Sequence, residues 1–183
     1  AATDDVVWSS GSLDRDLKDI FAVQDEIAGL IAKNLSLKMG VAARAPHQVN
    51  PEALTALLEG RHFWALRTME GFARAGELFN RAVALDPDWA PAHAALASLL
   101  TIEASYRKGG GDSVSEQYAL AAREAKRAIE LDPTLGEPHA ALGKIAMEDR
   151  RFAEAEEESR RALELEPNNA LVVDWHGDLM VTR

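Results

Sequence analysis

A proline-terminated motif occurs three times in this chain and constrains its fold more than any other feature. Leu-Asp-Pro ends at Pro87 and at Pro133, and Leu-Glu-Pro ends at Pro167. Counting back from each proline, an aromatic residue lies fifteen positions before it, and alanines lie twelve and five positions before it. These columns contain Phe72, Tyr118 and Phe152; Ala75, Ala121 and Ala155; and Ala82, Ala128 and Ala162. The agreement indicates an internal repeat.

Each repeat is expected to be a pair of antiparallel helices. Small residues such as Ala75 and Ala155 allow two helices to approach closely, and a larger side chain there would overpack the contact. The aromatic residue three positions earlier fills the space near the turn. The proline then ends the second helix, because its ring cannot continue a hydrogen-bonded helix and disfavours the helical conformation in the residue before it.

The columns resemble those of the tetratricopeptide repeat family. Residues 136–169 match that family's 34-residue pattern most completely. The copy at 54–88 differs, because Gly60 lies three positions further from its proline than Gly143 does from its own. The copy at 90–135 carries the insertion SYRKGGGDSVSE between its helices.

The resemblance implies an all-α, right-handed superhelical solenoid of antiparallel helix pairs. It comprises about three repeats, at 54–88, 90–135 and 136–169, and a partial fourth at 170–183. The expected helices span 52–67, 71–85, 90–105, 114–131, 137–149, 152–165 and 170–181. The family's large first-helix tryptophan is replaced by His93 and His139 in two copies.

The first part of the chain differs from the repeats. Residues 1–12 are expected to be a remnant strand or loose segment, 13–39 to contain a helix at about 18–37, and 40–51 to connect it to a repeat domain at 52–183. The helix prediction rests on an apolar stripe at Leu17, Ile20, Phe21, Ile27, Ile31 and Leu35. The connector GVAARAPHQVNP is rich in turn-forming residues.

Residues 6–35 resemble a junction in bacterial multidomain regulators, where an α/β domain like the N-terminal domain of TolB precedes tetratricopeptide repeats. The matching positions are Trp8, Ser9, Asp14, Arg15, Leu17, Asp19, Ile20, Phe21, Gln24, Asp25, Glu26 and Ile27. The resemblance implies that the chain is a fragment of a longer regulator. Its upstream effector would be an adenylate or guanylate cyclase domain, a winged-helix DNA-binding domain or a kinase.

Composition limits the partners and the compartment. The formal charge of -10 argues against nucleic-acid binding, which relies on lysine and arginine neutralising phosphates. The absence of cysteine excludes disulfides, thiolate metal sites and a cysteine nucleophile. No segment reaches the length of a membrane helix, the longest apolar run being 94–102. We expect no membrane insertion and a cytoplasmic location, or a periplasmic one if the parent protein has an upstream membrane span.

No catalytic, cofactor or metal site is expected. The run GGGDS at 109–113 lacks the Gly-Lys-Ser/Thr of a phosphate loop, so it is interpreted as a flexible insertion. No two of the five histidines are three or four residues apart, the spacing that puts two metal ligands on one helix face. The chain is therefore predicted not to be an enzyme.

The expected site is the concave groove lined by the first helix of each repeat. The family's inward-facing positions correspond to Leu57, Arg61, Trp64, Ala94, Ser98, Thr101, Ala140, Lys144 and Met147, with Asp174 and Asp178 from the partial repeat. The lysine and asparagine clamp with which some relatives bind a C-terminal carboxylate is absent. We expect a protein or peptide partner with apolar anchors and some acidic residues. The competing interpretation is that Trp64 and Met147 only pack against neighbouring helices.

Two further expectations concern self-association and the function of the chain. The helix at 170–181 carries apolar residues that no later helix in the chain covers, so self-association through one or both ends is predicted. The function expected is a non-catalytic protein-binding scaffold. The alternative is an intramolecular sensor or oligomerisation arm that regulates an effector domain.

Overall fold

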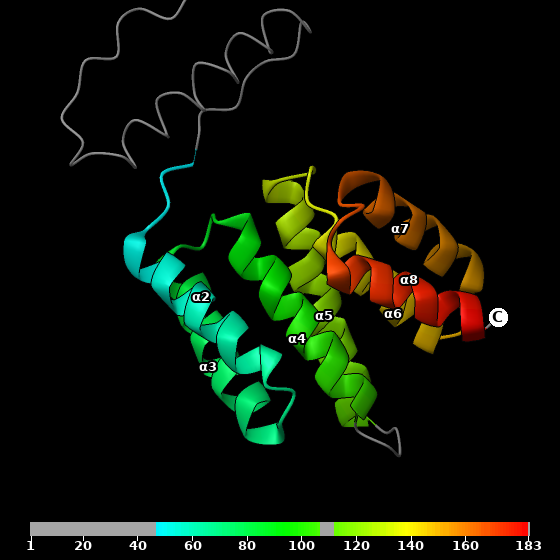
Figure 1. Ribbon diagram of the computed structural model, residues 1–183, viewed down its shortest axis with the longest axis horizontal. Coiled ribbons are helices and arrows are strands. Elements are labelled where there is room, and N and C mark those ends of the chain that lie inside the picture. The colour runs from blue at the N-terminus through cyan, green and yellow to red at the C-terminus, as the bar shows by residue number, and fades with distance from the viewer. Residues whose placement is uncertain (1–46, 107–111, 183) are drawn as a thin grey trace, which may run out of the picture. The chain divides into compact units, whose positions relative to one another are not determined.

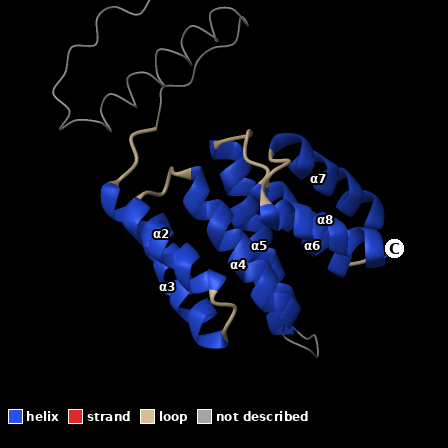
Figure 2. Ribbon diagram, in the orientation of Figure 1, coloured by secondary structure: helices blue, strands red, loops and turns tan. Residues whose placement is uncertain are grey.

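The computed structural model describes residues 47–106 and 112–182, and every regular element among them is an α-helix (Figures 1 and 2). The helices are α2 (Pro51–Ala65), α3 (Met69–Leu85), α4 (Ala90–Tyr106), α5 (Asp112–Leu131), α6 (Glu137–Glu148), α7 (Phe152–Leu165) and α8 (Ala170–Thr182). The chain divides into two compact units, 1–48 and 49–183. The second unit contains the seven helices of the described residues.

The helices expected between residues 52 and 181 are all present, with small differences at their ends. The largest difference at a helix start is two residues, in α3, which begins at Met69 rather than at residue 71, and in α5, which begins at Asp112 rather than at residue 114. The expected segment at 1–12, the helix at 18–37, the connector to residue 46 and most of the glycine run lie outside the described residues. The all-α prediction is confirmed for the described part of the chain.

Local sequence signals set the ends of these helices. Asn50 caps α2, since its side chain accepts a hydrogen bond from the Glu52 N–H, and Pro51 occupies the first helical position. Thr68 caps α3 in the same way through the N–H of Gly71. Helices α3, α5 and α7 each end at a leucine two residues before a repeat proline, as the motif predicted.

The helices pack as successive antiparallel pairs, α2 with α3, α4 with α5 and α6 with α7 (Figure 1). The first helices also contact one another in series, α2 with α4, α4 with α6 and α6 with α8. Among the described residues the second helices α3, α5 and α7 make no contact with one another. Because the inner side of a curved stack is the shorter one, the first helices line the inner side.

Small residues permit the close approach within each pair. Ala75, Ala121 and Ala155 have no exposed surface. A Cβ added to Gly60 would lie 2.5 Å from a ring carbon of Phe79 on α3, so only glycine fits at this contact. Helix α4 lies at the centre, with 12 of its 17 residues buried, as expected of a helix that is apolar on all sides.

None of these helices is long and apolar enough to cross a membrane. The described side chains also contain no cluster of three or more histidines and carboxylates that could hold a metal ion.

Candidate functional site

The inner side carries a pocket of about 440 Å³ between the end of α2 and the start of α8. We call it the α2–α8 pocket. It is lined by Arg61, Trp64, Ala65, Arg67, Ala170, Leu171 and Asp174. One wall comes from α2 and the other from α8, the two outermost helices of the inner row α2, α4, α6 and α8. The walls combine apolar side chains with charges of both signs. This mixture is typical of ligand sites, where a few polar groups orient a largely apolar contact.

Trp64 anchors the α2 wall. Its side chain is 7% exposed and lies edge-to-face against Phe79, with ring centroids 6.3 Å apart. The guanidinium carbon of Arg67 lies 5.5 Å from the centroid of the Trp64 ring, a cation–π distance. Arg67 has a left-handed backbone, with φ of 53°, which costs a non-glycine residue about 1–2 kcal/mol. Helix α2 therefore ends in a turn that places this cation beside the tryptophan.

An ion pair crosses the inner side from the first repeat to the third. Nη2 of Arg61 lies 2.7 Å from Oε2 of Glu137 at the start of α6. The Glu137 side chain is 6% exposed, so its charge needs a partner, and the helix N-terminus also favours it. Its second oxygen, Oε1, is buried without a hydrogen-bond partner. Arg61 therefore neutralises a buried carboxylate.

A second ion pair joins the third repeat to α8. Nζ of Lys144 lies 2.8 Å from Oδ2 of Asp178 and 3.7 Å from Oε1 of Glu148. The Lys144 side chain is only 12% exposed. Both inward-facing cations expected from the sequence, Arg61 and Lys144, are thus paired with carboxylates of the same chain.

The remaining predicted groove residues pack between helices. They are Leu57, Ala94, Ser98, Thr101, Ala140 and Met147, and all are buried. Ala140, Lys144 and Met147 meet α8 around a hollow of about 10 Å³, which is at the lower limit for one water molecule. Of the nine predicted residues, the structure brings only Arg61 and Trp64 into the α2–α8 pocket, and a binding role for the nine stays a prediction.

Sequence reasoning did not select four residues of the pocket, Ala65, Arg67, Ala170 and Leu171. The three additional residues between Gly60 and its repeat proline were the available signal for an unusual turn. Leu171 was assigned to an uncovered helix rather than to a groove. Its position in the pocket depends on how α8 stacks against α6, which no local pattern encodes.

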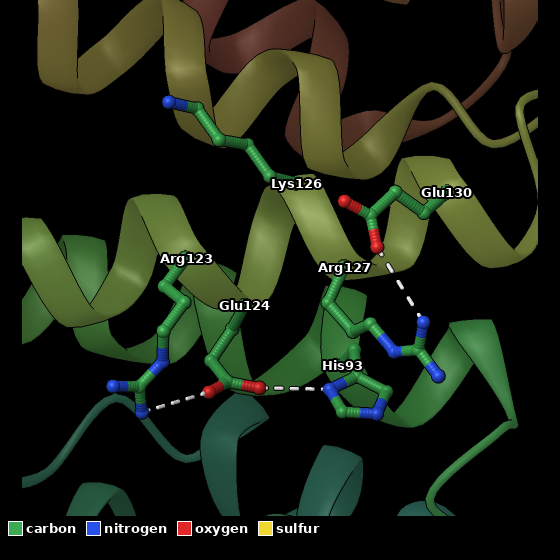
Figure 3. A pocket seen from close by; sticks show the side chains of 6 residues that line it. All are labelled: His93, Arg123, Glu124, Lys126, Arg127 and Glu130. Carbon is green, nitrogen blue, oxygen red and sulfur yellow. Dashed lines mark hydrogen bonds and ion pairs between the residues drawn. The ribbon is translucent and has the colours of Figure 1, made fainter.

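A second pocket, of about 400 Å³, lies between α4 and α5 (Figure 3). At its base Nδ1 of His93 lies 2.7 Å from Oε2 of Glu124, and Nε2 lies 2.9 Å from the carbonyl oxygen of Pro87. Arg127 pairs with Asp88 at 2.7 Å. The Lys126 side chain extends away from His93 (Figure 3).

The next repeat contains the same contact, His139 with Glu158 at 2.7 Å. In two repeats a histidine–glutamate bond therefore joins the paired helices at the position where the family has its tryptophan. This repetition favours a structural role for the α4–α5 pocket.

A third pocket, of about 630 Å³, lies at the turn between α2 and α3 and includes Phe63, Leu66 and Thr68. It lies within one helix pair and does not join different repeats. The α2–α8 pocket is therefore the better candidate for a binding site.

Comparison with known proteins supports the fold. The sequence model of the family described as "Tetratricopeptide repeat" matches residues 137–169, which are the third repeat. Residues 137–169 are therefore a tetratricopeptide repeat, and the described helices have a tetratricopeptide-like fold.

Solved tetratricopeptide domains resemble it in structure. The Arabidopsis OM64 domain has a TM-score of 0.54 at 16% identity, covering 72% of this chain and 97% of that one. The second domain of Spaghetti (RPAP3), bound to the HSP90 peptide SRMEEVD, has a TM-score of 0.50 at 22% identity, covering 63% and 94%. The TPR2B domain of yeast Sti1, in a complex with pHsp70, has a TM-score of 0.54 at 16% identity, covering 73% and 100%. At these identities the likeness shows the fold alone.

One curated relative is similar in sequence. "Putative adenylate cyclase 3" of Rhizobium meliloti (strain 1021) is 37% identical over 91 residues. The match covers 45% of this chain and 15% of that protein. The chain therefore spans a small part of the relative's length.

Proposed function

We propose that this tetratricopeptide repeat domain is a non-catalytic scaffold of a larger bacterial regulatory protein, and that it binds a protein or peptide segment in the α2–α8 pocket. The proposal rests on the observation that α2 and α8 line one open pocket, whose walls are partly apolar and partly charged. One solved domain of the same fold is described as bound to an HSP90 peptide and another as a complex with pHsp70, which supports a binding role.

The pocket favours a segment with an apolar anchor. Ala65, Trp64 and Leu171 offer apolar surface, whereas the charge of Arg61 is already taken by Glu137. An acidic partner residue would meet Arg67 on the α2 wall, and a basic one would meet Asp174 on the α8 wall. Recognition should therefore depend on the apolar anchor first, with one charged residue setting the orientation.

Display selection tests this proposal. A library of random short peptides is selected on the full chain, and the selected sequences are measured against two variants. Ala65→Arg fills the pocket wall, and it should weaken binding by about tenfold or more because it removes the apolar contact. Ala153→Arg introduces the same side chain at an exposed position on α7 and should leave binding unchanged. Equal loss in both variants, or none in Ala65→Arg, would place binding elsewhere.

An intramolecular sensor or oligomerisation arm is the second candidate function. The similarity to a curated protein named as an adenylate cyclase supports it, because a regulatory arm would act on such an upstream domain. An isolated cyclase domain from the parent protein, used as bait, would capture this chain under the second function. Under the first function the cyclase domain would not capture this chain, and this chain used as bait would capture a separate protein.

A further inference from the structure

Ion pairs tie both walls of the α2–α8 pocket to the same third helix, α6. Arg61 on the α2 wall pairs with Glu137 at the start of α6. Lys144, further along α6, pairs with Asp178 on α8. Helix α6 thus holds one wall through a carboxylate and the other through an ammonium group.

The two walls differ in what else holds them to α6. Helix α8 packs directly against α6, so the Lys144–Asp178 pair adds to an existing contact. Helix α2 packs on α3 and α4, and among the described residues it does not pack against α6 (Figure 1). In stacked repeats each unit normally contacts only its neighbours. The Arg61–Glu137 pair departs from this rule, because it joins the first repeat to the third.

This longer connection bears on the width of the pocket. The curvature of a solenoid follows from a small rotation between each repeat and the next. A rotation of the α2–α3 pair against α4 would move the α2 wall away from α8 or towards it, while α6 and α8 stay together. Because the Arg61–Glu137 pair skips α4, it opposes this rotation directly.

Burial makes the connection costly to break. The Glu137 side chain is 6% exposed, whereas that of Arg61 is 40% exposed. Removing the cation from a buried ion pair is strongly destabilising, because an uncompensated charge is left in the interior. Movement of the α2 wall that separates the two side chains would leave Glu137 in that condition. The position of α2 in which Arg61 reaches Glu137 is therefore favoured.

We propose that Glu137 is a positioning residue of the α2–α8 pocket, and that it acts through Arg61 to fix the α2 wall relative to α6 and α8. Glu137 is not among the residues that line the pocket, so its effect on a partner comes through the distance between the walls. The inference rests on the proposed function, since it takes this pocket as the binding site. Its test needs no peptide.

Double electron–electron resonance on the full chain measures the distance between the walls. The sequence has no cysteine, so Glu59→Cys on α2 and Val173→Cys on α8 place spin labels at these two positions alone. Both side chains are exposed, and neither lines the pocket. The labelled chain should give a narrow distance distribution. Adding Glu137→Gln, which removes the charge and keeps the size, should broaden the distribution and lengthen its mean.

Variants of Arg61 separate positioning from a merely structural role. Arg61→Lys keeps a cation for Glu137, so the distribution should stay narrow. Arg61→Gln removes the cation and should broaden the distribution. If Glu137 only stabilised the start of α6, the lysine and glutamine variants would give the same distances.

A double variant covers the case in which a single change prevents folding. Arg61→Gln combined with Glu137→Gln leaves no unpaired buried charge, so this variant should fold. Its distribution should be as broad as that of Glu137→Gln alone, because the connection is lost in both.

Glu157→Gln is the matched control. It removes the same charge from an exposed pair with Arg160 that lies within α7 and joins no two repeats. The distance distribution should not change.

Equal distributions in the labelled chain and in the folded double variant would overturn the inference. So would broadening by Glu157→Gln, or an Arg61→Lys variant as broad as Arg61→Gln. A chain that shows the expected distances but binds no displayed peptide would count against the proposed function alone.

Discussion

Glycine has opposite effects at two positions of the first helix pair. Gly60 on α2 faces the Phe79 ring, and a Cβ there would lie 2.5 Å from a ring carbon that is fully buried and held against Trp64. Gly76 on α3 has room, since its nearest neighbour would be Leu99 at an ordinary 3.5 Å. The same substitution should therefore change stability in opposite directions.

Gly60→Ala should lower the free energy of unfolding by about 1–3 kcal/mol through overpacking. Gly76→Ala should raise it by up to about 1 kcal/mol, because alanine favours a helix more than glycine does. Urea denaturation of the two variants measures both changes. If both variants shift the midpoint in the same direction, the contact of α2 with α3 is not as described.

Tyr118 gives the domain a dependence on alkaline pH. Burial, with the carboxylates of Glu148 and Asp149 nearby, raises the pKa of Tyr118 from 10.0 to about 12. The folded state thus keeps the phenol proton at a pH where the unfolded state has lost it. The stabilisation is complete below pH 10 and declines as the pH rises from about 10 towards 12.

Tyr118→Phe should remove this loss. The other two repeats carry phenylalanine in the same column, so the ring should still fit. The variant should lose less stability than the unaltered chain between pH 8 and pH 11, as measured by urea midpoints. An identical loss in both proteins would mean that Tyr118 titrates as it does in the unfolded chain.

At the scale of the helix pair, a histidine–glutamate hydrogen bond stands at the position where the family has a tryptophan. His139 on α6 meets Glu158 on α7 at 2.7 Å, and both side chains are largely covered. Removing one partner leaves the other without its hydrogen bond in a partly buried place, whereas removing both leaves two apolar surfaces that can pack. The two helices should therefore tolerate the double change better than either single one.

His139→Leu and Glu158→Leu should each lower the free energy of unfolding by about 1–3 kcal/mol. The double variant should be less destabilised than the sum of the two singles, with a coupling of about 0.5–3 kcal/mol. Thermal unfolding of the four proteins provides the cycle. Strict additivity would show that the two side chains act separately.

Helix boundaries could be predicted because their signals are local. The repeat prolines end α3, α5 and α7 within two residues, and Asn50 with Pro51 begins α2. The turn after α2 could not be predicted, since nothing in the residue type of Arg67 indicates a left-handed backbone.

The site could be predicted only in part, because it depends on contacts between repeats. Arg61 and Lys144 read as free cations in the sequence, yet their partners Glu137 and Asp178 lie 76 and 34 residues further along the chain. Leu171 likewise enters the pocket only through the stacking of α8. An acidic residue of a partner would therefore have to compete with Glu137 for Arg61 and with Asp178 for Lys144.

At the scale of the whole domain, the α2–α8 pocket depends on the stack, because Trp64 and Ala65 come from α2 whereas Leu171 and Asp174 come from α8. Ala65 is exposed, so Ala65→Arg should impair peptide binding without lowering the urea midpoint of unfolding. Loss of both properties in this variant would mean that the substitution disturbs the stack rather than the pocket alone.

Binding of a partner segment between α2 and α8, on the inner side of the stack, can be tested by an amide NMR titration of the full chain with a peptide obtained by display. Shift changes should concentrate at the end of α2, around Trp64 to Arg67, and at the start of α8, around Leu171 and Asp174. Changes concentrated instead around His93 and Glu124, or on α7, would contradict it.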